Sequence, residues 1–316
     1  MVSPGIILVC VLVPLLGALI LPALGRISVG LRNIAALAFV LTSLVTAALM
    51  LPQALSGNPL LMTIELPLGF SFGFLADGLA VFMALTSSLV SAVIVFYSFG
   101  YMEHYANQNE YYLMVVLFIG SMMGLVFSTN LLLIYTFWEI SAVCCWRLIG
   151  FFREKDYVLK ADKAFLVTVG GAVLMLVGFI GIYAQAGTFD LIELQGKGLD
   201  NWIMIMILFG ILSKSATLPL HTWLPDAGVA PSPVTSILHA AVLVKIGVYI
   251  YARLFLVNFH LDVSWELIVP IIAAVSALVS AGAAMVDNNI KRITININKD
   301  SFPDINSFNN FLCHTF

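Results

Sequence analysis

Long apolar segments dominate this sequence and restrict its fold more than any other feature. A helix that crosses the hydrocarbon core of a bilayer needs about 20 apolar residues. About nine segments meet this requirement: 4–24, 33–55, 73–99, 111–127, 130–151, 162–185, 201–218, 232–257 and 265–286. Because lipid offers the backbone no hydrogen-bond partners, segments of this length must be helical. The sequence therefore predicts an all-α fold, a polytopic transmembrane helix bundle of about nine helices.

The composition supports an integral membrane protein and excludes several other classes. Hydrophobic residues make up 61% of the chain and charged residues 10%, whereas soluble domains carry about 25% charged residues. The net charge is −3, and lysine and arginine do not cluster as a nucleic-acid interface requires. The four cysteines have no metal-ligand spacing. We therefore expect no nucleic-acid partner, no metal site and no cofactor.

Basic residues in the short loops predict the orientation of the chain. Lysine and arginine are enriched in cytoplasmic loops. They occur between the first two spans, between the fifth and sixth, and after the ninth: Arg26, Arg32, Arg153, Lys155, Lys160, Lys291 and Arg292. All of these loops lie on one side if the N-terminus is outside, although Arg253 near the outer end of the eighth span is an exception. Because basic residues follow the first apolar segment, we expect that segment to be a retained span.

Four ionisable side chains lie within the predicted spans: Glu139, Lys214, His239 and Lys245. A charge at the bilayer centre costs roughly 2.5–3.5 kcal/mol on insertion scales, so such residues face a bundle interior or a wet cavity. A pair of Glu139 and Lys214 would act as a switch for proton release, although a permanent structural ion pair is an alternative. In a regular helix, His239 and Lys245 would lie about 9 Å apart along the axis. They can share one hydrated path but not one ligand set.

Two prolines follow the seventh span and predict an interruption at membrane depth. Pro219 and Pro225 flank Leu220–Leu224, and proline ends or kinks a helix. Lys214 lies five residues before Pro219. Broken helices at membrane depth form ion sites in transporters. We therefore predict a broken helix followed by a re-entrant or interfacial loop, with an ordinary proline-containing loop as the alternative.

Three stretches resemble the motifs of a known family. Trp138–Phe151 is similar to the fifth helix of the proton-pumping antiporter-like subunits. Lys214–Ala227 resembles their seventh helix and its break, and Pro231–Ala241, continuing through Val244–Tyr249, resembles their eighth helix. The resemblance covers approximately residues 70–292. This family comprises the large membrane-arm subunits of respiratory complex I, Mrp-type sodium/proton antiporters and the membrane subunits of group 4 hydrogenases.

The resemblance implies a site and a domain organisation. It assigns proton transfer to Glu139, Lys214, His239 and Lys245, and it assigns redox chemistry to partner subunits. It also implies two inverted five-helix repeats, of which this chain carries the first. The predicted divisions are 1–110 for three N-terminal spans, 111–257 for the five-helix repeat, 258–292 for the start of an incomplete second repeat, and 293–316 for a polar tail.

The leading functional hypothesis is a proton-translocating subunit of an NADH-quinone oxidoreductase type complex, with other membrane-arm subunits as partners, in a prokaryotic inner membrane. An Mrp-type Na⁺/H⁺ antiporter subunit and a group 4 hydrogenase membrane subunit are alternatives. Cys145 and Arg147 depart from the complex I pattern, which leaves the subfamily open. Thr294–Phe316 is polar where the family continues into further helices. We therefore expect a C-terminal truncation, and a non-transporting fragment is a third alternative.

Overall fold

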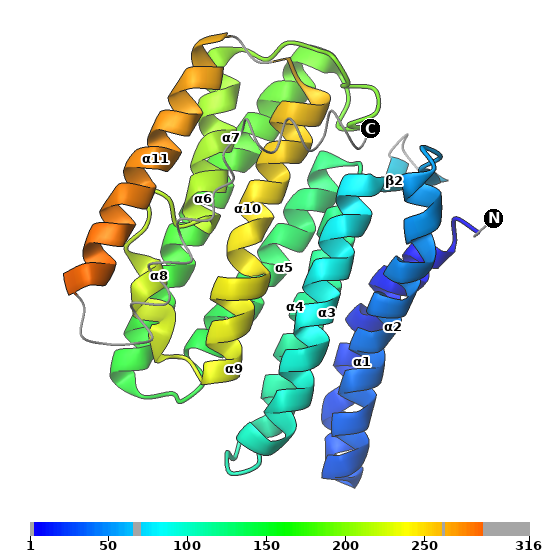
Figure 1. Cartoon of the computed structure of the whole chain (residues 1–316), viewed down its shortest axis with the longest axis vertical. Coiled ribbons are helices and arrows are strands. Elements are labelled where there is room, and N and C mark those ends of the chain that lie inside the picture. The colour runs from blue at the N-terminus through cyan, green and yellow to red at the C-terminus, as the bar shows by residue number, and fades with distance from the viewer. Residues whose placement is uncertain (1–2, 66–70, 261–262, 287–316) are drawn as a thin grey trace. The chain divides into compact units, whose positions relative to one another are not determined.

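The predicted transmembrane helices are present in a computed structural model, which describes residues 3–65, 71–260 and 263–286 (Figure 1). Within these residues, eight helical segments are long and apolar enough to cross a membrane, and a ninth apolar helix has 14 residues. The prediction of a polytopic helical protein is confirmed. The polar tail from residue 293 lies outside the described residues.

The main helices are α1 (Ile6–Ile27), α2 (Val29–Leu55), α3 (Gly78–Tyr101), α4 (Gln108–Phe127), α5 (Leu131–Ile149), α6 (Lys155–Ala186), α7 (Asn201–Lys214), α10 (Leu243–Tyr251) and α11 (Val263–Val286). Shorter helical segments are α8 (Trp223–Asp226), η2 (Ala227–Val229), α9 (Ser232–Thr235), η3 (Ser236–Ala241) and η4 (Ala252–Asn258). The described residues form two compact units, one within residues 3–161 together with 230–242, and one within residues 162–229 together with 243–286.

In the first unit, α1 packs against both α2 and α4, α2 packs against α3, and α4 packs against α5. The absence of a side chain at Gly120 allows α4 to approach α1 closely. A Cβ atom there would lie only 2.7 Å from the backbone nitrogen of Leu15. Small residues at helix contacts are typical of membrane bundles, where close backbone approach maximises van der Waals packing.

The sequence did not predict an antiparallel hairpin of β1 (Leu60–Glu65) and β2 (Ser71–Ala76), which pairs Leu60 with Ala76 and Glu65 with Ser71. The predicted third span, 73–99, is therefore wrong at its start, because α3 begins only at Gly78. The physical reason is an N-cap: the Asp77 carboxylate accepts a hydrogen bond from the Ala80 backbone N–H (2.9 Å).

A tight turn joins α4 and α5. Asn130 is the N-cap of α5, and its side-chain oxygen accepts hydrogen bonds from the backbone N–H groups of Leu132 and Leu133. Its side-chain nitrogen donates to the Ser71 carbonyl oxygen (3.0 Å). The β2 strand thus holds the α4–α5 turn in place.

In the second unit, glycines on α6 form the contact with α7. A Cβ atom on Gly171 would lie 3.0 Å from the Phe209 carbonyl oxygen and would overlap the Ser213 side chain. A Cβ atom on Gly178 would lie 2.7 Å from the Ile207 side chain. The glycines let α6 approach α7 closely and so fix the position of the residues that α7 carries.

The eighth span is not the regular α-helix that was predicted over 232–257. It consists of α9, the π-helical η3, α10 and the π-helical η4. Between η3 and α10, Val242 has φ −133° and ψ −59°, outside helical values. The spacing of His239 and Lys245 was calculated for a regular helix, and the backbone between them is not a regular helix. π-helical segments inside α-helices are rare and occur frequently at functional sites.

Candidate ion-transfer site

Lys214 is the last residue of α7 and is completely buried, with 0% of its surface exposed. The helix ends there because the backbone changes direction two residues later. Ala216 has φ +51°, and the Thr217 N–H donates to the Leu212 carbonyl (3.0 Å). This left-handed residue with a 6→1 hydrogen bond is a Schellman motif. Lys214 is thus the last residue at the C-terminal end of α7, the end of a helix that favours positive charge.

Trp223 of α8 completes the end of α7. Its indole Nε1 donates a buried hydrogen bond of 2.9 Å to the Ser213 carbonyl oxygen. The last carbonyl groups of a helix have no partner within the helix. In a membrane protein such a group needs a protein partner, because lipid supplies none. Because Trp223 supplies this partner, α7 can end inside the protein next to Lys214 without leaving the Ser213 carbonyl group unsatisfied.

Two further contacts hold the segment between α7 and α8. The Leu218 N–H donates to Ser276 Oγ on α11 (3.2 Å). Lys163 of α6 forms an ion pair with Asp226 (2.7 Å) and donates to the Thr222 carbonyl oxygen (3.3 Å). The prediction of a broken helix is confirmed, although the helical part ends at Lys214 and not at residue 218.

Lys245 is half-buried on α10, the helix that packs against α7. The contact is close at Gly247, two residues further on, where a Cβ atom would lie 3.0 Å from the Ile211 carbonyl oxygen and would overlap Ser215 Oγ. Lys245 and Lys214 thus lie on two helices of the same unit that are in direct contact.

Glu139 belongs to the first unit, where it lies in the middle of α5 and is half-buried. Tyr135, one helical turn earlier, forms a side-chain hydrogen bond with it. A buried carboxylate requires such partners, because burial of an uncompensated charge is costly. The predicted pair of Glu139 with Lys214 stays a prediction, since the two residues belong to different units.

His239 lies in η3, a π-helical segment of the first unit that follows α9. Its side chain lies outside the described part of the structure. The two halves of the eighth span have different partners. The first half, α9 and η3, packs against α3, whereas α10 packs against α7. The backbone irregularity therefore falls where the eighth span passes from one unit to the other.

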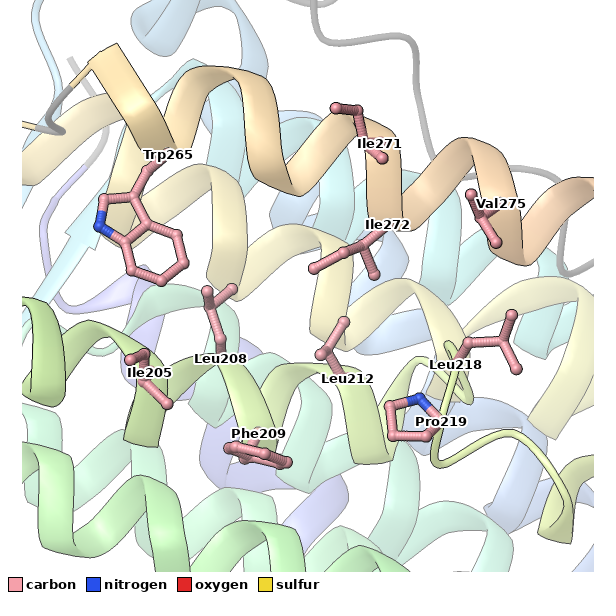
Figure 2. A pocket seen from close by; sticks show the side chains of 10 residues that line it. All are labelled: Ile205, Leu208, Phe209, Leu212, Leu218, Pro219, Trp265, Ile271, Ile272 and Val275. Carbon is pink, nitrogen blue, oxygen red and sulfur yellow. The ribbon is translucent and has the colours of Figure 1, made fainter.

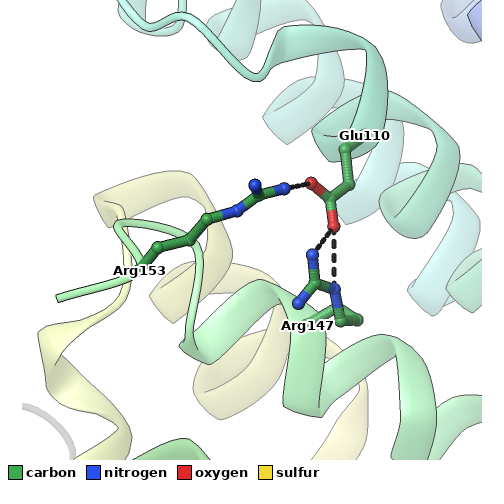
Figure 3. Close-up of polar contacts among 3 residues, drawn as sticks. All are labelled: Glu110, Arg147 and Arg153. Carbon is green, nitrogen blue, oxygen red and sulfur yellow. Dashed lines mark hydrogen bonds and ion pairs between the residues drawn. The ribbon is translucent and has the colours of Figure 1, made fainter. Parts of the chain in front are cut away.

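A charge cluster that the sequence did not predict lies at the end of the α4–α5 hairpin (Figure 3). The Glu110 carboxylate forms ion pairs with Arg147, the last basic residue of α5, and with Arg153 (2.6 Å) in the α5–α6 loop. In the sequence, Arg147 stood out only as a departure from the complex I pattern. Arg153 has φ +56°, a rare conformation for a residue with a side chain.

Two buried arginines were also not predicted as site residues. Arg32 donates to the side-chain oxygens of Asn33, Asn109 and Gln108. Arg253 in η4 donates to the Tyr249 hydroxyl. Hydropathy alone places both near span ends, where snorkelling is the usual outcome. Only the three-dimensional structure brings their partners together.

An apolar cavity of about 500 Å³ lies between α7, the segment after it, and α11 (Figure 2). Its lining residues are Ile205, Leu208, Phe209, Leu212, Leu218, Pro219, Trp265, Ile271, Ile272 and Val275. Trp265 is fixed at one end by a hydrogen bond to Asn201 (2.8 Å). None of the predicted proton-transfer residues is among those that line this cavity.

Together, the fold and the buried ionisable residues define a multi-pass integral membrane protein with a discontinuous helix. Residues 128–295, more than half of the chain, match the family model "NADH:quinone oxidoreductase/Mrp antiporter, TM", and the chain belongs to this family. Residues 63–112 match the model "NADH-Ubiquinone oxidoreductase (complex I), chain 5 N-terminus". The resemblance found in the sequence motifs is thus confirmed.

Curated relatives include Na⁺/H⁺ antiporter subunit A1 of Staphylococcus haemolyticus, 35% identical over 259 residues, and that of Staphylococcus aureus, 32% identical over 260 residues. These alignments cover 78% of this chain and 32% of each relative. The chain therefore spans about a third of the length of the curated relatives it matches.

Solved structures share the fold. A chain of the Mrp complex from Dietzia sp. DQ12-45-1b has a TM-score of 0.84 at 21% identity, covering 95% of this chain and 57% of that one. A chain of the archaeal membrane-bound sulfane sulfur reductase has a TM-score of 0.83 at 20% identity, covering 94% and 63%. At these identities the similarity extends to the fold alone.

Proposed function

We propose that this chain is the proton-translocating part of an Mrp-type Na⁺/H⁺ antiporter subunit, and that protons move through Glu139, Lys214, His239 and Lys245. The observation that carries the proposal is the placement of Lys214. It is fully buried at the point where α7 ends, and the neighbouring carbonyl group is satisfied by Trp223. Intramembrane ionisable residues at broken helices are typical of ion pathways.

Lysine suits this role because its two protonation states differ in hydrogen bonding. The charged ammonium group has three donors and no acceptor, and the group changes its protonation state readily when it is buried. Lys214 and Lys245 lie on contacting helices of one unit. We propose that a proton released by one lysine passes to the other along this helix pair.

The identity of the relatives favours an Mrp-type antiporter over the complex I type that was the leading hypothesis from the sequence. The antiporter subunits of Staphylococcus are 32–35% identical over 78% of this chain. The complex I type is a second candidate, because residues 63–112 match a family model described from complex I. In both cases we propose that other membrane subunits are partners.

We also propose the orientation and the domain organisation predicted from the sequence. The basic loops place the N-terminus outside, in the inner membrane of a prokaryotic cell. The five-helix repeat over 111–257 and the beginning of a second repeat over 258–292 follow from the family motifs.

Replacement of the buried groups tests the proposal. Lys214→Gln and Glu139→Gln remove the exchangeable charge and retain a polar side chain. In inside-out vesicles containing the complete protein with its bound subunits, we expect both variants to lose Na⁺-driven proton exchange while remaining in the complex. Lys197→Gln, at an exposed loop position, is the matched control and retains exchange. Normal exchange by a correctly assembled Lys214→Gln variant would refute the assignment of Lys214.

The same vesicles distinguish the two candidate complexes. An antiporter exchanges protons for Na⁺ when no electron donor is present. A complex I type subunit requires electron transfer in its partners and copurifies with iron–sulfur or quinone-reducing subunits. Proton movement that depends on an electron donor would therefore favour the second candidate.

A further inference from the structure

The apolar cavity between α7 and α11 is elongated and belongs to the second unit (Figure 2). Trp265 lies at one end of the cavity. Val275, Leu218 and Pro219 lie at the other. Trp265 and Val275 are ten residues apart on α11, which corresponds to about 15 Å along the helix axis. Its volume of about 500 Å³ falls within the range of about 300–1,000 Å³ that is usual for ligand pockets.

The lining of the cavity suits neither water nor a polar ligand. Among the residues that the structure describes, the lining side chains are aliphatic or aromatic, and the indole of Trp265 carries their one polar group. That indole N–H donates to Asn201 Oδ1 (2.8 Å) at the start of α7. A buried water needs about two to four polar partners, and a polar group without a hydrogen bond is costly to bury. The part of a molecule that fills this cavity is therefore apolar.

The cavity is continuous with the exposed apolar surface of α11. Ile271 and Val275 line the cavity, and they are 52% and 48% exposed. Leu267 and Leu278 on the same helix are mostly exposed. In a transmembrane helix, such side chains contact lipid tails or another membrane segment. The cavity therefore opens sideways, toward the hydrophobic interior of the bilayer.

The length of the cavity matches one leaflet of a bilayer. The hydrocarbon core is about 30 Å thick, so one leaflet contributes about 15 Å. Tryptophan is enriched at the membrane–water interface. Trp265 lies in the first turn of α11, and the exposed Trp202 lies in the first turn of α7. The end of the cavity at Trp265 thus corresponds to the interface, and the other end lies deeper, at the connection that follows α7.

The volume of the cavity distinguishes an acyl chain from other membrane components. A helix with its side chains is about 10–12 Å wide, so 15 Å of it occupies roughly 1,200 Å³. This is more than twice the volume of the cavity, whereas an extended hydrocarbon chain carries no side chains. A quinone has a polar ring that needs hydrogen-bond partners, and the described lining offers none. These properties favour a single linear chain.

We propose that the cavity binds one acyl chain of a membrane phospholipid, with the head group beside Trp265 and the methyl end against Leu218 and Pro219. The inference goes beyond the proposed function, because it requires only that the chain spans a membrane. The bound acyl chain packs against the connection between α7 and α8, where the Leu218 N–H donates to Ser276 Oγ (3.2 Å). It thereby supports the segment that follows Lys214.

A photoactivatable phosphatidylethanolamine, with a diazirine in one acyl chain, tests the proposal. The complete protein with its bound subunits is reconstituted into phosphatidylethanolamine vesicles that contain this probe. After irradiation, mass spectrometry identifies the labelled residues. A diazirine near the carboxyl end of the acyl chain should label Trp265 and Ile205, and one near the methyl end should label Leu218 and Val275.

Three other labelling patterns would overturn the proposal. The reverse order of labelling would contradict the direction of the acyl chain. Labelling confined to exposed residues such as Leu278 would indicate only the lipid that surrounds every membrane protein. An unlabelled lining would show that another part of the complete protein fills the cavity.

Variants that fill the cavity provide a matched comparison. Leu212→Trp and Ile272→Trp add volume inside it from two different helices. Leu278→Trp adds the same indole on the exposed face of α11 and is the control. We expect the two filling variants to lose most of the labelling at Leu218 and Val275, while the control keeps it. Equal labelling in all assembled variants would contradict a lipid inside the cavity.

Thermal unfolding in detergent tests the same site without labelling. A ligand that binds the folded state raises the unfolding temperature. We expect phosphatidylethanolamine to raise the unfolding temperature of the delipidated natural protein and of Leu278→Trp, and to raise that of Leu212→Trp less. An equal rise in both variants, or a rise with an isoprenoid quinone in place of the lipid, would overturn the proposal. Lys214→Gln should retain the rise, so failure of the lipid site and failure of the proposed antiport function can be told apart.

Discussion

The indole Nε1 of Trp223 lies 2.9 Å from the backbone carbonyl oxygen of Ser213, the residue before the buried Lys214. A side chain of α8 thus satisfies the backbone of α7 across the interruption that separates them. Between these elements, the chain reverses at Ala216 and is held to α11 through Ser276. Specific hydrogen bonds stabilise the interruption, and each of them can be tested separately.

Trp223→Phe removes the indole donor and keeps an aromatic ring. We expect this change to destabilise the protein by about 1–3 kcal/mol, because a buried carbonyl loses its partner. Ion exchange should fall with stability, since the end of α7 positions Lys214. Thermal unfolding in detergent measures the first effect and vesicle transport the second. Trp202→Phe is the matched control, because Trp202 is an exposed tryptophan. An equal loss in both variants would contradict the special role of Trp223.

Ala216→Gly is expected to stabilise the protein. Ala216 has φ +51°, and the left-handed region costs a residue with a Cβ atom roughly 1–2 kcal/mol. Glycine is the preferred residue at this position of a Schellman motif. The unfolding temperature should therefore rise. Ala48→Gly, at an exposed helical position of α2, should lower it, because glycine in a helix interior costs roughly 0.5–1 kcal/mol. A decrease in both variants would argue against the left-handed backbone.

Two adjacent glycines of α6 offer a matched comparison. A Cβ atom on Gly171 would overlap Ser213, whereas a Cβ atom on Gly170 would meet nothing within 4 Å. Gly171→Ala should destabilise the protein by about 1–3 kcal/mol through overpacking. Gly170→Ala should leave stability unchanged or increase it. Thermal unfolding of both variants measures the difference, and equal values would show that α6 does not pack against α7 through Gly171.

Glu110→Gln removes the carboxylate that joins Arg147 and Arg153. Arg153 is 55% exposed, so solvent weakens this part of the cluster, and we expect a loss of at most about 1 kcal/mol. The loss should decrease at high salt, because mobile ions screen exposed charges. Unfolding temperatures at low and high salt measure the effect. Glu65→Gln, at an exposed position of β1, is the control. A loss independent of salt would indicate a packing role.

The positions of the helices followed from the sequence because hydropathy depends on local composition. About nine apolar segments were recognised in this way. The start of α3 and the β-hairpin were missed, because Ser71–Ala76 is apolar enough to continue a span and only its pairing with Leu60–Glu65 makes it a strand.

The candidate site was predicted in its residue types but not in its contacts. Lys214 and Pro219 indicated a broken helix, yet nothing in the sequence identified Trp223 as the partner of the helix end. Arg253 was recorded only as an exception to the charge distribution in the loops. Its partner Tyr249 is an ordinary aromatic residue until the π-helical segment brings the hydroxyl and the guanidinium group together.

The shortness of α7 has an electrical consequence. Its 14 residues extend about 21 Å, whereas the hydrocarbon core is about 30 Å thick. Moving one elementary charge across the full membrane changes the free energy by about 2.3 kcal/mol per 100 mV. If protons exchange at Lys214, as we propose, each transfer step crosses only a fraction of this voltage. Under that proposal, the position where α7 ends sets how the membrane potential is divided between the entry and the exit of a proton.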